Sequence, residues 1–203
     1  MQDRTESSRQ VISLKFPLKR SRFSFPPINH HDDRQRRLII RQIESSFSAY
    51  GSALADVRAR AEEAALLIHR GSPFIQEHTA SVCPSCVRVC CVNRHSYHET
   101  EDIVLLYALG FKVPPYQEGI DDSDPCRFLD ERGCAVPRRL RPHRCNWYFC
   151  TPLLHHIREA PGREYRAFVA MLAQMTDTRA KMLQAFTDAV ETVPGLWEAW
   201  HFQ

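Results

Sequence analysis

Half of the cysteines in this chain lie in one stretch of nine residues, CPSCVRVCC, from Cys83 to Cys91. The segment from residue 83 to residue 150 holds all eight cysteines of the chain and is rich in Pro, Gly and Arg. Such a composition predicts an irregular backbone. A segment without a helical or sheet hydrogen-bond ladder needs other cross-links, and bound metal supplies them. The four later cysteines are Cys126, Cys134, Cys145 and Cys150.

The spacing of the first four cysteines suits a soft metal ion. If this stretch is helical, Cys83, Cys86 and Cys90 share one face at about 100° per residue, and Cys91 points to one flank. Thiolates are preferred ligands of zinc and of iron–sulfur clusters. A disulfide between the adjacent Cys90 and Cys91 would be strained, so it would make a poor structural cross-link.

Eight thiols suit two four-coordinate centres, or one four-thiolate cluster with four further cysteines nearby. The chain contains only one CxxC, unlike a zinc ribbon with its two CxxC knuckles. A third cysteine four residues after the CxxC is closer to iron–sulfur ligation. Because of this spacing, we favour an iron–sulfur cluster over Zn²⁺. The softness of the thiolate ligands alone does not distinguish the two.

Arginines and aromatic residues surround the cysteines. Guanidinium groups could offset the negative charge of a thiolate centre, or they could form an ordinary solvated basic face. The aromatic run Trp147–Phe149 could shield a cluster from water or pack in the core. The arginines of the segment are Arg88, Arg94, Arg127, Arg132, Arg138, Arg139, Arg141 and Arg144.

Three motifs together resemble the YkgJ-like cysteine-cluster family, whose members are described as having a zinc- or iron-chelating domain. The motifs are CPSCVRVCC, PCRFLDERGC and LRPHRCNWYFC, and the resemblance covers residues 80–152. The family hallmark is CxxCxxCC, whereas three residues, 87–89, separate the second and third cysteines here. The resemblance implies that the metal ligands are Cys83, Cys86, Cys90, Cys91, Cys126, Cys134, Cys145 and Cys150.

Some members of this family are described as iron–sulfur oxidoreductases, and a related cysteine block occurs in flagellin lysine methylases. This chain has no Gly-rich dinucleotide motif and no P-loop, so neither activity is carried over. The first hypothesis is a metal-binding cysteine-cluster protein. The alternatives are an iron–sulfur oxidoreductase or electron-transfer subunit, and a zinc-stapled interaction module without catalysis that uses the tail with Trp197 and Trp200.

Two other chemistries compete with metal binding by thiolates. Cys83-Pro-Ser-Cys86 is also typical of a thiol–disulfide active site, which lies between a strand and a helix. The preceding GSPFIQEHTASV does not have the pattern of a buried strand, so metal binding is favoured. The nearby histidines His95, His98 and His143 are not needed as ligands when eight thiols are present.

Two apolar stripes at helical spacing flank the cysteine segment. The first predicts a helix over 36–70 that stops at 71–73, Gly-Ser-Pro. The second runs through Tyr165, Phe168, Leu172, Met175, Met182 and Phe186, with Arg179 as an interruption and an end at Pro194-Gly195. We expect an intramolecular antiparallel helix pair, with a coiled-coil dimer as the alternative. The first stripe consists of Ile43, Phe47, Tyr50, Leu54, Val57, Ala61, Ala64 and Ile68.

A shorter helix is predicted inside the cysteine segment, from Thr100 to Gly110, with acidic residues in its first turn and glycine after its end. The expected fold is therefore mainly α, with two long helices and a shorter helix supporting an irregular cysteine-rich metal-binding segment. Residues 1–34 are expected to form a basic N-terminal arm, disordered or docked as a loose strand. Residues 35–203 are expected to form a single α-rich domain.

Composition limits the location and the partners. The longest apolar stretch, IVLLYALGF, is too short to cross a bilayer. The first thirty residues contain no secretory signal, so a cytoplasmic location with reduced thiols is expected. A net charge of +3 gives no argument for a nucleic-acid partner. A protein partner stays open, and we expect a monomer or a helix-mediated dimer.

Overall fold

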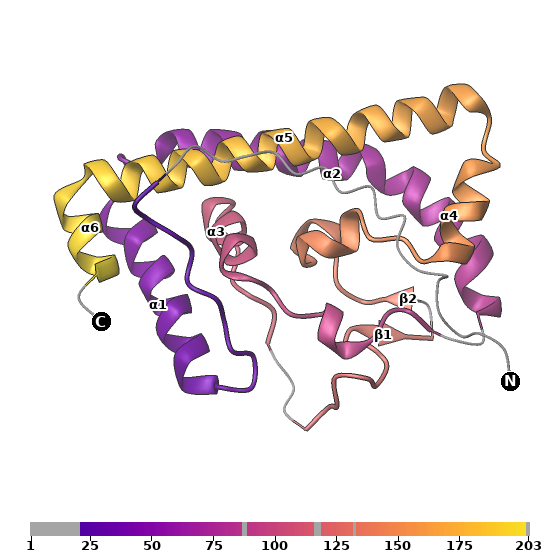
Figure 1. Cartoon of the computed structure of the whole chain (residues 1–203), viewed down its shortest axis with the longest axis horizontal. Coiled ribbons are helices and arrows are strands. Elements are labelled where there is room, and N and C mark those ends of the chain that lie inside the picture. Colours follow the sequence, from indigo (N-terminus) through magenta and orange to yellow (C-terminus); the bar gives the residue numbers. More distant parts are fainter. Residues whose placement is uncertain (1–20, 87–88, 116–118, 132, 202–203) are drawn as a thin grey trace, which may run out of the picture.

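The computed structural model describes residues 21–86, 89–115, 119–131 and 133–201. Helices dominate this part of the chain, which confirms the prediction of a mainly α fold (Figure 1). None of the helices in the described ranges is long and apolar enough to cross a membrane. The α-helices are α1 Asp33–Ala49, α2 Ala55–Val82, α3 Thr100–Ala108, α4 Thr151–Arg158, α5 Gly162–Thr192 and α6 Pro194–His201.

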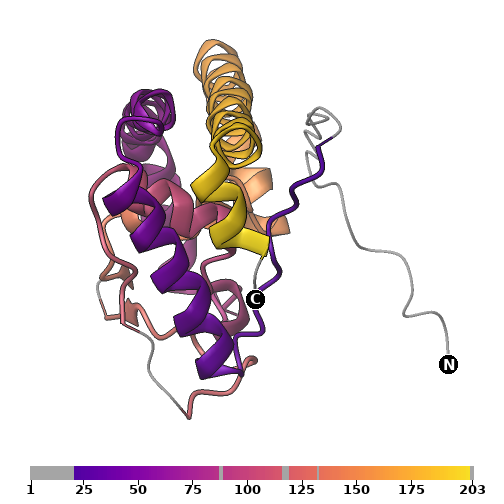
Figure 2. The same ribbon diagram turned by 90° about the vertical axis from the view of Figure 1, so that its left-hand side faces the viewer.

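The two longest helices, α2 and α5, lie side by side along the long axis of the molecule and run in opposite directions (Figures 1 and 2). At one end of the pair, Leu54 and Val57 share an apolar cluster with Phe186 and Val190. At the other end, Ile75 of α2 lies in a cluster with Phe168 of α5. The predicted intramolecular antiparallel pair is therefore confirmed.

The helix predicted over 36–70 is two helices. The backbone leaves helical geometry at Tyr50, and α2 begins five residues later, after a turn that contains Gly51. Leu54 in this turn is completely buried, so the apolar stripe continues through the break. The periodicity therefore gave no sign that the chain turns there.

The predicted stop at residues 71–73 is wrong, because α2 continues through Pro73 to Val82. A proline inside a helix costs about 3 kcal/mol. The turns that follow it offset this cost by burying Ile75 and His78 against α4 and α5. Gly71 belongs to the same contact, since a Cβ atom there would overlap the Met171 side chain of α5.

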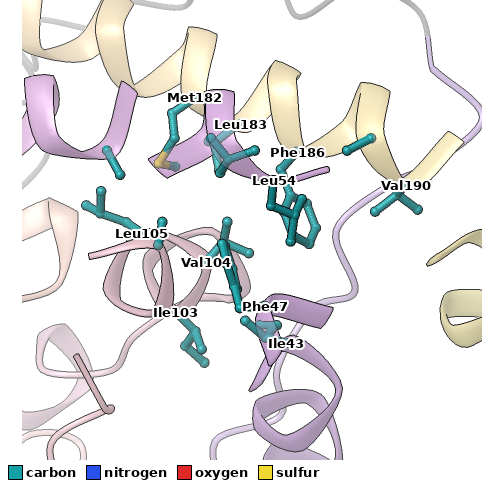
Figure 3. Packing of buried hydrophobic residues seen from close by; sticks show 14 of the residues in the cluster. Ile43, Phe47, Leu54, Ile103, Val104, Leu105, Met182, Leu183, Phe186 and Val190 are labelled. Atoms are coloured by element: carbon teal, nitrogen blue, oxygen red, sulfur yellow. The ribbon is translucent and has the colours of Figure 1, made fainter. Parts of the chain in front are cut away.

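Helix α3 packs beneath the α2–α5 pair and confirms the third predicted helix. Its residues Ile103, Val104 and Leu105 are buried against Met182, Leu183 and Phe186 of α5 (Figure 3). A capping box of Glu99 and Asp102 begins the helix. Gly110 follows its end with a φ of 77°, a conformation that favours glycine.

Residues 21–32 of the predicted N-terminal arm pack against the helical body, while residues 1–20 lie outside the described ranges. Phe23 and Ile28 are buried in the core. The Glu191 carboxylate of α5 accepts hydrogen bonds from the Phe23 backbone N–H at 2.9 Å and from the Ser21 hydroxyl at 2.8 Å. This part of the arm is therefore ordered, and α1 begins at Asp33.

The C-terminal tryptophans pack inside the chain. The indole N–H of Trp200 donates to the Ser46 hydroxyl at 3.2 Å, and its ring lies 5.3 Å from that of Phe23. The Trp197 ring stacks under the Arg22 guanidinium. Both tryptophans are thus partly buried against the main core.

Candidate metal centre

Two antiparallel stretches of chain hold the early and the late cysteines together. The Cys126 N–H donates to the carbonyl of Cys91 at 2.8 Å, and the Asn93 N–H donates to the carbonyl of Asp124 at 2.8 Å. Val92 and Pro125 form an isolated β-bridge between them. The first cysteine block is thus bonded, through the backbone, to the beginning of the second.

The segment is irregular, as predicted, and it lies beneath one half of the α2–α5 pair (Figure 1). Cys134 lies in a two-stranded hairpin, next to Gly133, which begins the second strand with a φ of 109°. Cys145 lies in a short 3-10 turn, and Cys150 caps α4. The short elements are η1 Cys83–Ser85, η2 Asn93–His95, β1 Leu129–Asp130, β2 Gly133–Cys134, η3 Arg138–Leu140 and η4 His143–Asn146.

The helical arrangement considered for Cys83–Cys91 is limited, in the part that the structure describes, to a 3-10 turn at Cys83–Ser85. The 3-10 turn at Cys83 ends where Cys86 takes an extended conformation. Residues 87 and 88 lie outside the described ranges, and Cys90 belongs to no helix. A shared helical face therefore does not bring these thiols together.

The first group of neighbouring thiols surrounds Cys90. Its thiol hydrogen-bonds to Cys91 and to Cys150, which together with burial raises the pKa of Cys90. Burial also raises the pKa of the Cys83 thiol, and the nearby Cys91, Cys150 and Cys86 raise it further. Cys150, the last cysteine in the sequence, is thus a neighbour of the first block.

The second group surrounds Cys145. Burial raises the pKa of this thiol to about 12, and the nearby Cys134 and Cys126 raise it further. The pKa of Cys126 is raised by burial and then by Cys134 and Cys91. Cys91 therefore lies between the two groups, and all eight cysteines are free thiols.

The pKa of Cys91 is shifted in the opposite direction from those of Cys83, Cys90, Cys126 and Cys145. A hydrogen bond from the Cys90 thiol lowers the pKa of Cys91 to about 6, and the positive charges of Arg141 and Arg138 add to this effect. Burial is the main cause that raises the pKa of Cys83, Cys126 and Cys145, and the neighbouring thiolates raise it further. A set of such thiols ionises together only when positive charge is supplied among them.

Two of the eight predicted arginines lie at the thiols and fix the loops that carry them. The Arg141 Nε–H donates to the Val136 carbonyl at 2.7 Å, and its Nη2 donates to the Cys134 carbonyl at 3.3 Å. Arg138 Nη1 donates to the Cys145 carbonyl at 3.1 Å. Burial lowers the pKa of Arg138 to about 10, with a further contribution from Arg141, while the Cys145 and Cys134 thiolates oppose the change.

Other arginines of the segment have different partners. The Arg127 guanidinium lies over the Tyr97 ring and donates to Asn93 Oδ1 at 2.9 Å. Arg139 lies over the Phe111 ring. Arg88 and Arg132 lie outside the described ranges. In the part that the structure describes, Arg141 and Arg138 thus offset negative charge at Cys91, and Arg127 also offsets it at Cys126.

Whether the thiols fit a metal depends on donor chemistry and on convergence. The donors are soft thiols from distant parts of the chain that lie near one another, as a thiolate centre requires. Across the described ranges, however, no three His, Cys, Asp or Glu side chains converge tightly enough to hold an ion. The donor types suit a thiolate metal centre, but the described side chains are not yet close enough together to hold an ion.

Thiol–disulfide exchange fits the site less well. Cys83 follows the C-terminal end of α2, where its N–H donates to the Thr79 carbonyl. Redox-active cysteines instead lie at helix N-termini, which lower the thiol pKa. Since the pKa of Cys83 is raised, this thiol lacks the activation that exchange needs.

The histidines near the cysteines have structural partners. A ring nitrogen of His98 lies 2.9 Å from the Leu140 carbonyl, and Nδ1 of His95 lies 3.2 Å from the Cys90 carbonyl. Burial lowers the pKa of both. The contact of His98 connects the start of α3 to the η3 turn, and that of His95 lies within the first cysteine loop.

A pocket of about 230 Å³ adjoins the segment between η4, the start of α3 and α5. The ion pair of Arg179 and Asp102, 2.8 Å long, lines it together with His143. Burial lowers the pKa of His143 to about 3, with a further contribution from the Arg179 charge, so this imidazole is neutral. No cysteine is among the lining residues that the structure describes, so the pocket lies beside the thiols and does not contain them.

The three aromatic residues before Cys150 have different surroundings. Phe149 is buried with Phe168 in the cluster around α4, which is core packing. Trp147 lines the pocket, and Tyr148 is exposed beside His95. The core-packing role therefore holds for Phe149, and shielding of a cluster by this run stays a prediction.

Sequence reasoning missed Asn93, which is completely buried between the two halves of the segment. Its Nδ2 donates to the Ile120 carbonyl at 3.1 Å, and its Oδ1 accepts from Arg127 and from the Ser96 hydroxyl. A lone asparagine carries no spacing signal, so nothing in the sequence pointed to it. Its amide helps to hold the early and late cysteines together.

No family model, curated protein or solved structure matches this chain. The resemblance to the YkgJ-like proteins therefore stays a prediction that depends on the three cysteine motifs.

Proposed function

We propose that the cysteine segment binds a thiolate-ligated metal centre and that an iron–sulfur cluster is the preferred occupant. The observation that carries the proposal is that each of the eight thiols has at least one other thiol as a neighbour, although the cysteines come from distant parts of the chain. Loop Cys83–Cys91 and loop Cys126–Cys134 are also joined by backbone hydrogen bonds. Cysteines that served only as small side chains would not need to lie near one another.

The neighbour relations support two four-thiolate sets. Cys90 and Cys83 both have Cys150 as a neighbour, which favours a first set of Cys83, Cys86, Cys90 and Cys150. Cys145 and Cys126 both have Cys134 and Cys91 as neighbours, which favours a second set of Cys91, Cys126, Cys134 and Cys145. Each set has four donors, the number that tetrahedral zinc and iron–sulfur clusters use.

The arginines have a defined part in this proposal. Arg138 and Arg141 lower the pKa of Cys91, which gives the second set one thiolate before any metal arrives. The same guanidinium groups hold the carbonyls of Cys134 and Cys145. They therefore position the loop and offset part of the thiolate charge.

Binding would complete the convergence that the present arrangement lacks. Four ligands that already lie near one another lose little chain entropy when they close on an ion. An iron–sulfur cluster would supply one-electron transfer at this point, whereas zinc would supply only a cross-link. We place the protein in the cytoplasm, because eight free thiols persist in a reducing compartment.

Anaerobic purification with metal and sulfide analysis tests the proposal. An iron–sulfur centre gives stoichiometric iron and acid-labile sulfide, with absorption near about 400 nm that dithionite bleaches. Stoichiometric zinc in a colourless protein would overturn the preference for iron and favour the zinc-stapled alternative. Protein that takes up neither metal would overturn metal binding altogether.

Serine replacements test the division into two sets. Cys90→Ser and Cys145→Ser should each remove about half of the bound metal, because each disrupts one four-thiolate set. Ser85→Ala, in the same loop as the first block, should retain all of it. Loss of all metal in both cysteine variants would contradict two separate sets and indicate one shared centre.

A further inference from the structure

Two histidines face each other at the end of the molecule where α2 ends and α4 begins. Nδ1 of His78, on α2, lies 2.8 Å from Nδ1 of His156, on α4. The ring centroids are 5.0 Å apart, and the ring planes are inclined at 76°. His78 is buried and contacts the Phe74 ring, whereas His156 is half-buried at the edge of the contact.

This geometry is close to that of two imidazoles bound to one ion. Ligand nitrogens about 2.0–2.1 Å from a metal, at about 90–110° to each other, lie about 2.9–3.4 Å apart. Without a metal, the same contact is one hydrogen bond, in which one Nδ1–H donates to the lone pair of the other ring. A small increase in this distance, with a rotation of the rings that turns both nitrogen lone pairs toward one point, therefore converts the hydrogen-bonded pair into a two-nitrogen metal site.

The surroundings favour the neutral imidazoles that a metal needs. Burial lowers the pKa of His78, and the nearby His156 lowers it further. The carboxylates of Glu77 and Glu164 lie near enough to oppose this shift. Glu164 is exposed in the first turn of α5, so negative charge and a further oxygen donor lie close to the pair.

We propose that His78 and His156 form a second metal site, distinct from the thiols, for a borderline divalent cation such as Ni²⁺ or Zn²⁺. Imidazole nitrogen is a preferred ligand of these ions. Water completes the coordination, because only two protein nitrogens converge, and the nearby Glu164 carboxylate contributes negative charge.

The site would clamp two helices that carry thiol ligands. His78 precedes Cys83 by five residues on α2, and His156 follows Cys150 by six residues at α4. A cation between the imidazoles fixes these two helix ends relative to each other. The proposed metal site at the histidines does not depend on the thiol centre. The clamping of two helices that carry thiol ligands does depend on it, and so rests on the proposed function.

Titration of the full-length protein with Ni²⁺ tests the site. The protein is purified anaerobically, and its thiols are left in the state in which they were isolated. Calorimetry should detect one Ni²⁺ per chain, and the bound ion should lack the near-ultraviolet charge-transfer bands of nickel–thiolate bonds. The same Ni²⁺ should raise the thermal midpoint, because it binds only the folded protein.

His156→Ala should weaken Ni²⁺ binding about tenfold or more and abolish the thermal shift, since one of two nitrogen donors is lost. His155→Ala is the matched control, because His155 is the exposed neighbour on the same helix, and it should bind like the wild type. His78→Leu is a second test, because leucine removes the other nitrogen donor and fills the buried position with an apolar side chain. Circular dichroism checks that each variant is folded, and His156, being half-buried, is the safer site to change.

Equal Ni²⁺ affinity in the wild type and in folded His156→Ala would overturn the proposal, as would binding only with thiolate bands. No binding to the wild type would reduce the contact to an imidazole hydrogen bond and equally overturn it. The iron and sulfide content of His156→Ala is measured in parallel. A protein free of both iron and zinc that still binds Ni²⁺ through these histidines would refute the thiol centre and leave this site intact.

Discussion

The Asp102 carboxylate binds two partners at the start of α3. One oxygen accepts from the Glu99 backbone N–H at 3.2 Å, and the other accepts from Arg179 at 2.8 Å. Both members of the ion pair are largely buried. The pair therefore joins α3, which lies inside the cysteine segment, to α5 of the helical body.

Arg179→Met should destabilise the fold by about 3–5 kcal/mol, because it leaves the buried Asp102 charge without its partner. Urea unfolding at neutral pH measures this change. Lys181→Met is the control on the same helix, since Lys181 pairs with Asp177 in an exposed position and its loss should cost at most about 1 kcal/mol. Similar losses of stability in Arg179→Met and Lys181→Met would contradict the claim that burial makes the Arg179–Asp102 pair the stronger one.

The buried histidines should make stability depend on pH. Burial holds the pKa of His98 below its usual 6.5, so the unfolded chain takes up a proton that the folded protein refuses. The resulting stability is fully present above pH 6.5 and is lost as the pH falls from there. His78, His95 and His143 act in the same direction.

His98→Gln should flatten this dependence, because glutamine can keep the hydrogen bond to Leu140 without titrating. Urea midpoints measured between pH 7.5 and about 5 should fall less steeply in the variant than in the wild type. Parallel curves for the two proteins would show that His98 does not stay neutral in the fold.

At the residue scale, the sequence showed which side chains carry metal-binding groups but not which residues contact one another. Eight thiols in three motifs were visible directly, and the structure brings the loops that carry them together. Arg179 was visible only as a break in an apolar stripe, since its partner Asp102 is 77 residues away. The histidine pair was equally hidden, because His78 and His156 come from separate helices.

At the scale of elements, α2 shows how packing overrides a local stop signal. The Gly-Ser-Pro sequence predicted an end at 71–73, yet the helix continues to Val82 and carries Cys83 at its end. Local rules weigh the cost of proline alone and do not include the burial of Ile75 against a helix from the far end of the sequence. The same limit hid the turn between α1 and α2.

Pro73→Ala should stabilise the protein by about 1–2 kcal/mol, because Pro73 is exposed and alanine restores a helical N–H. Thermal or urea unfolding measures the gain. Gln76→Ala, exposed one turn later, should change stability by only about 0.3 kcal/mol. A loss of stability in Pro73→Ala would mean that the proline conformation itself is required.

At the scale of the whole molecule, a helical body supports one irregular segment. The main core lies among α1, α2, α3, α5 and α6 and includes no cysteine (Figure 3). The thiols lie outside this core, beneath the other half of the α2–α5 pair (Figure 1). The body should therefore fold without metal, whereas the loops of the segment should depend on it.

Removal of metal should consequently act on one region. Amide hydrogen exchange of the apoprotein should lose protection at Cys91–Asn93 and Cys126, where backbone bonds join the two blocks. Protection in the middle of α5 should stay within about threefold of the loaded protein. Loss of protection throughout the chain would instead make the metal a condition for folding of the helical body.

X-ray absorption at the metal edge of the loaded protein tests the central claim most directly, since it reports the ligand atoms. The account predicts a first shell of sulfur, about four atoms at about 2.3 Å per metal ion, that loses sulfur in Cys145→Ser. A first shell of nitrogen and oxygen alone would contradict a thiolate centre, whatever the metal content of the sample.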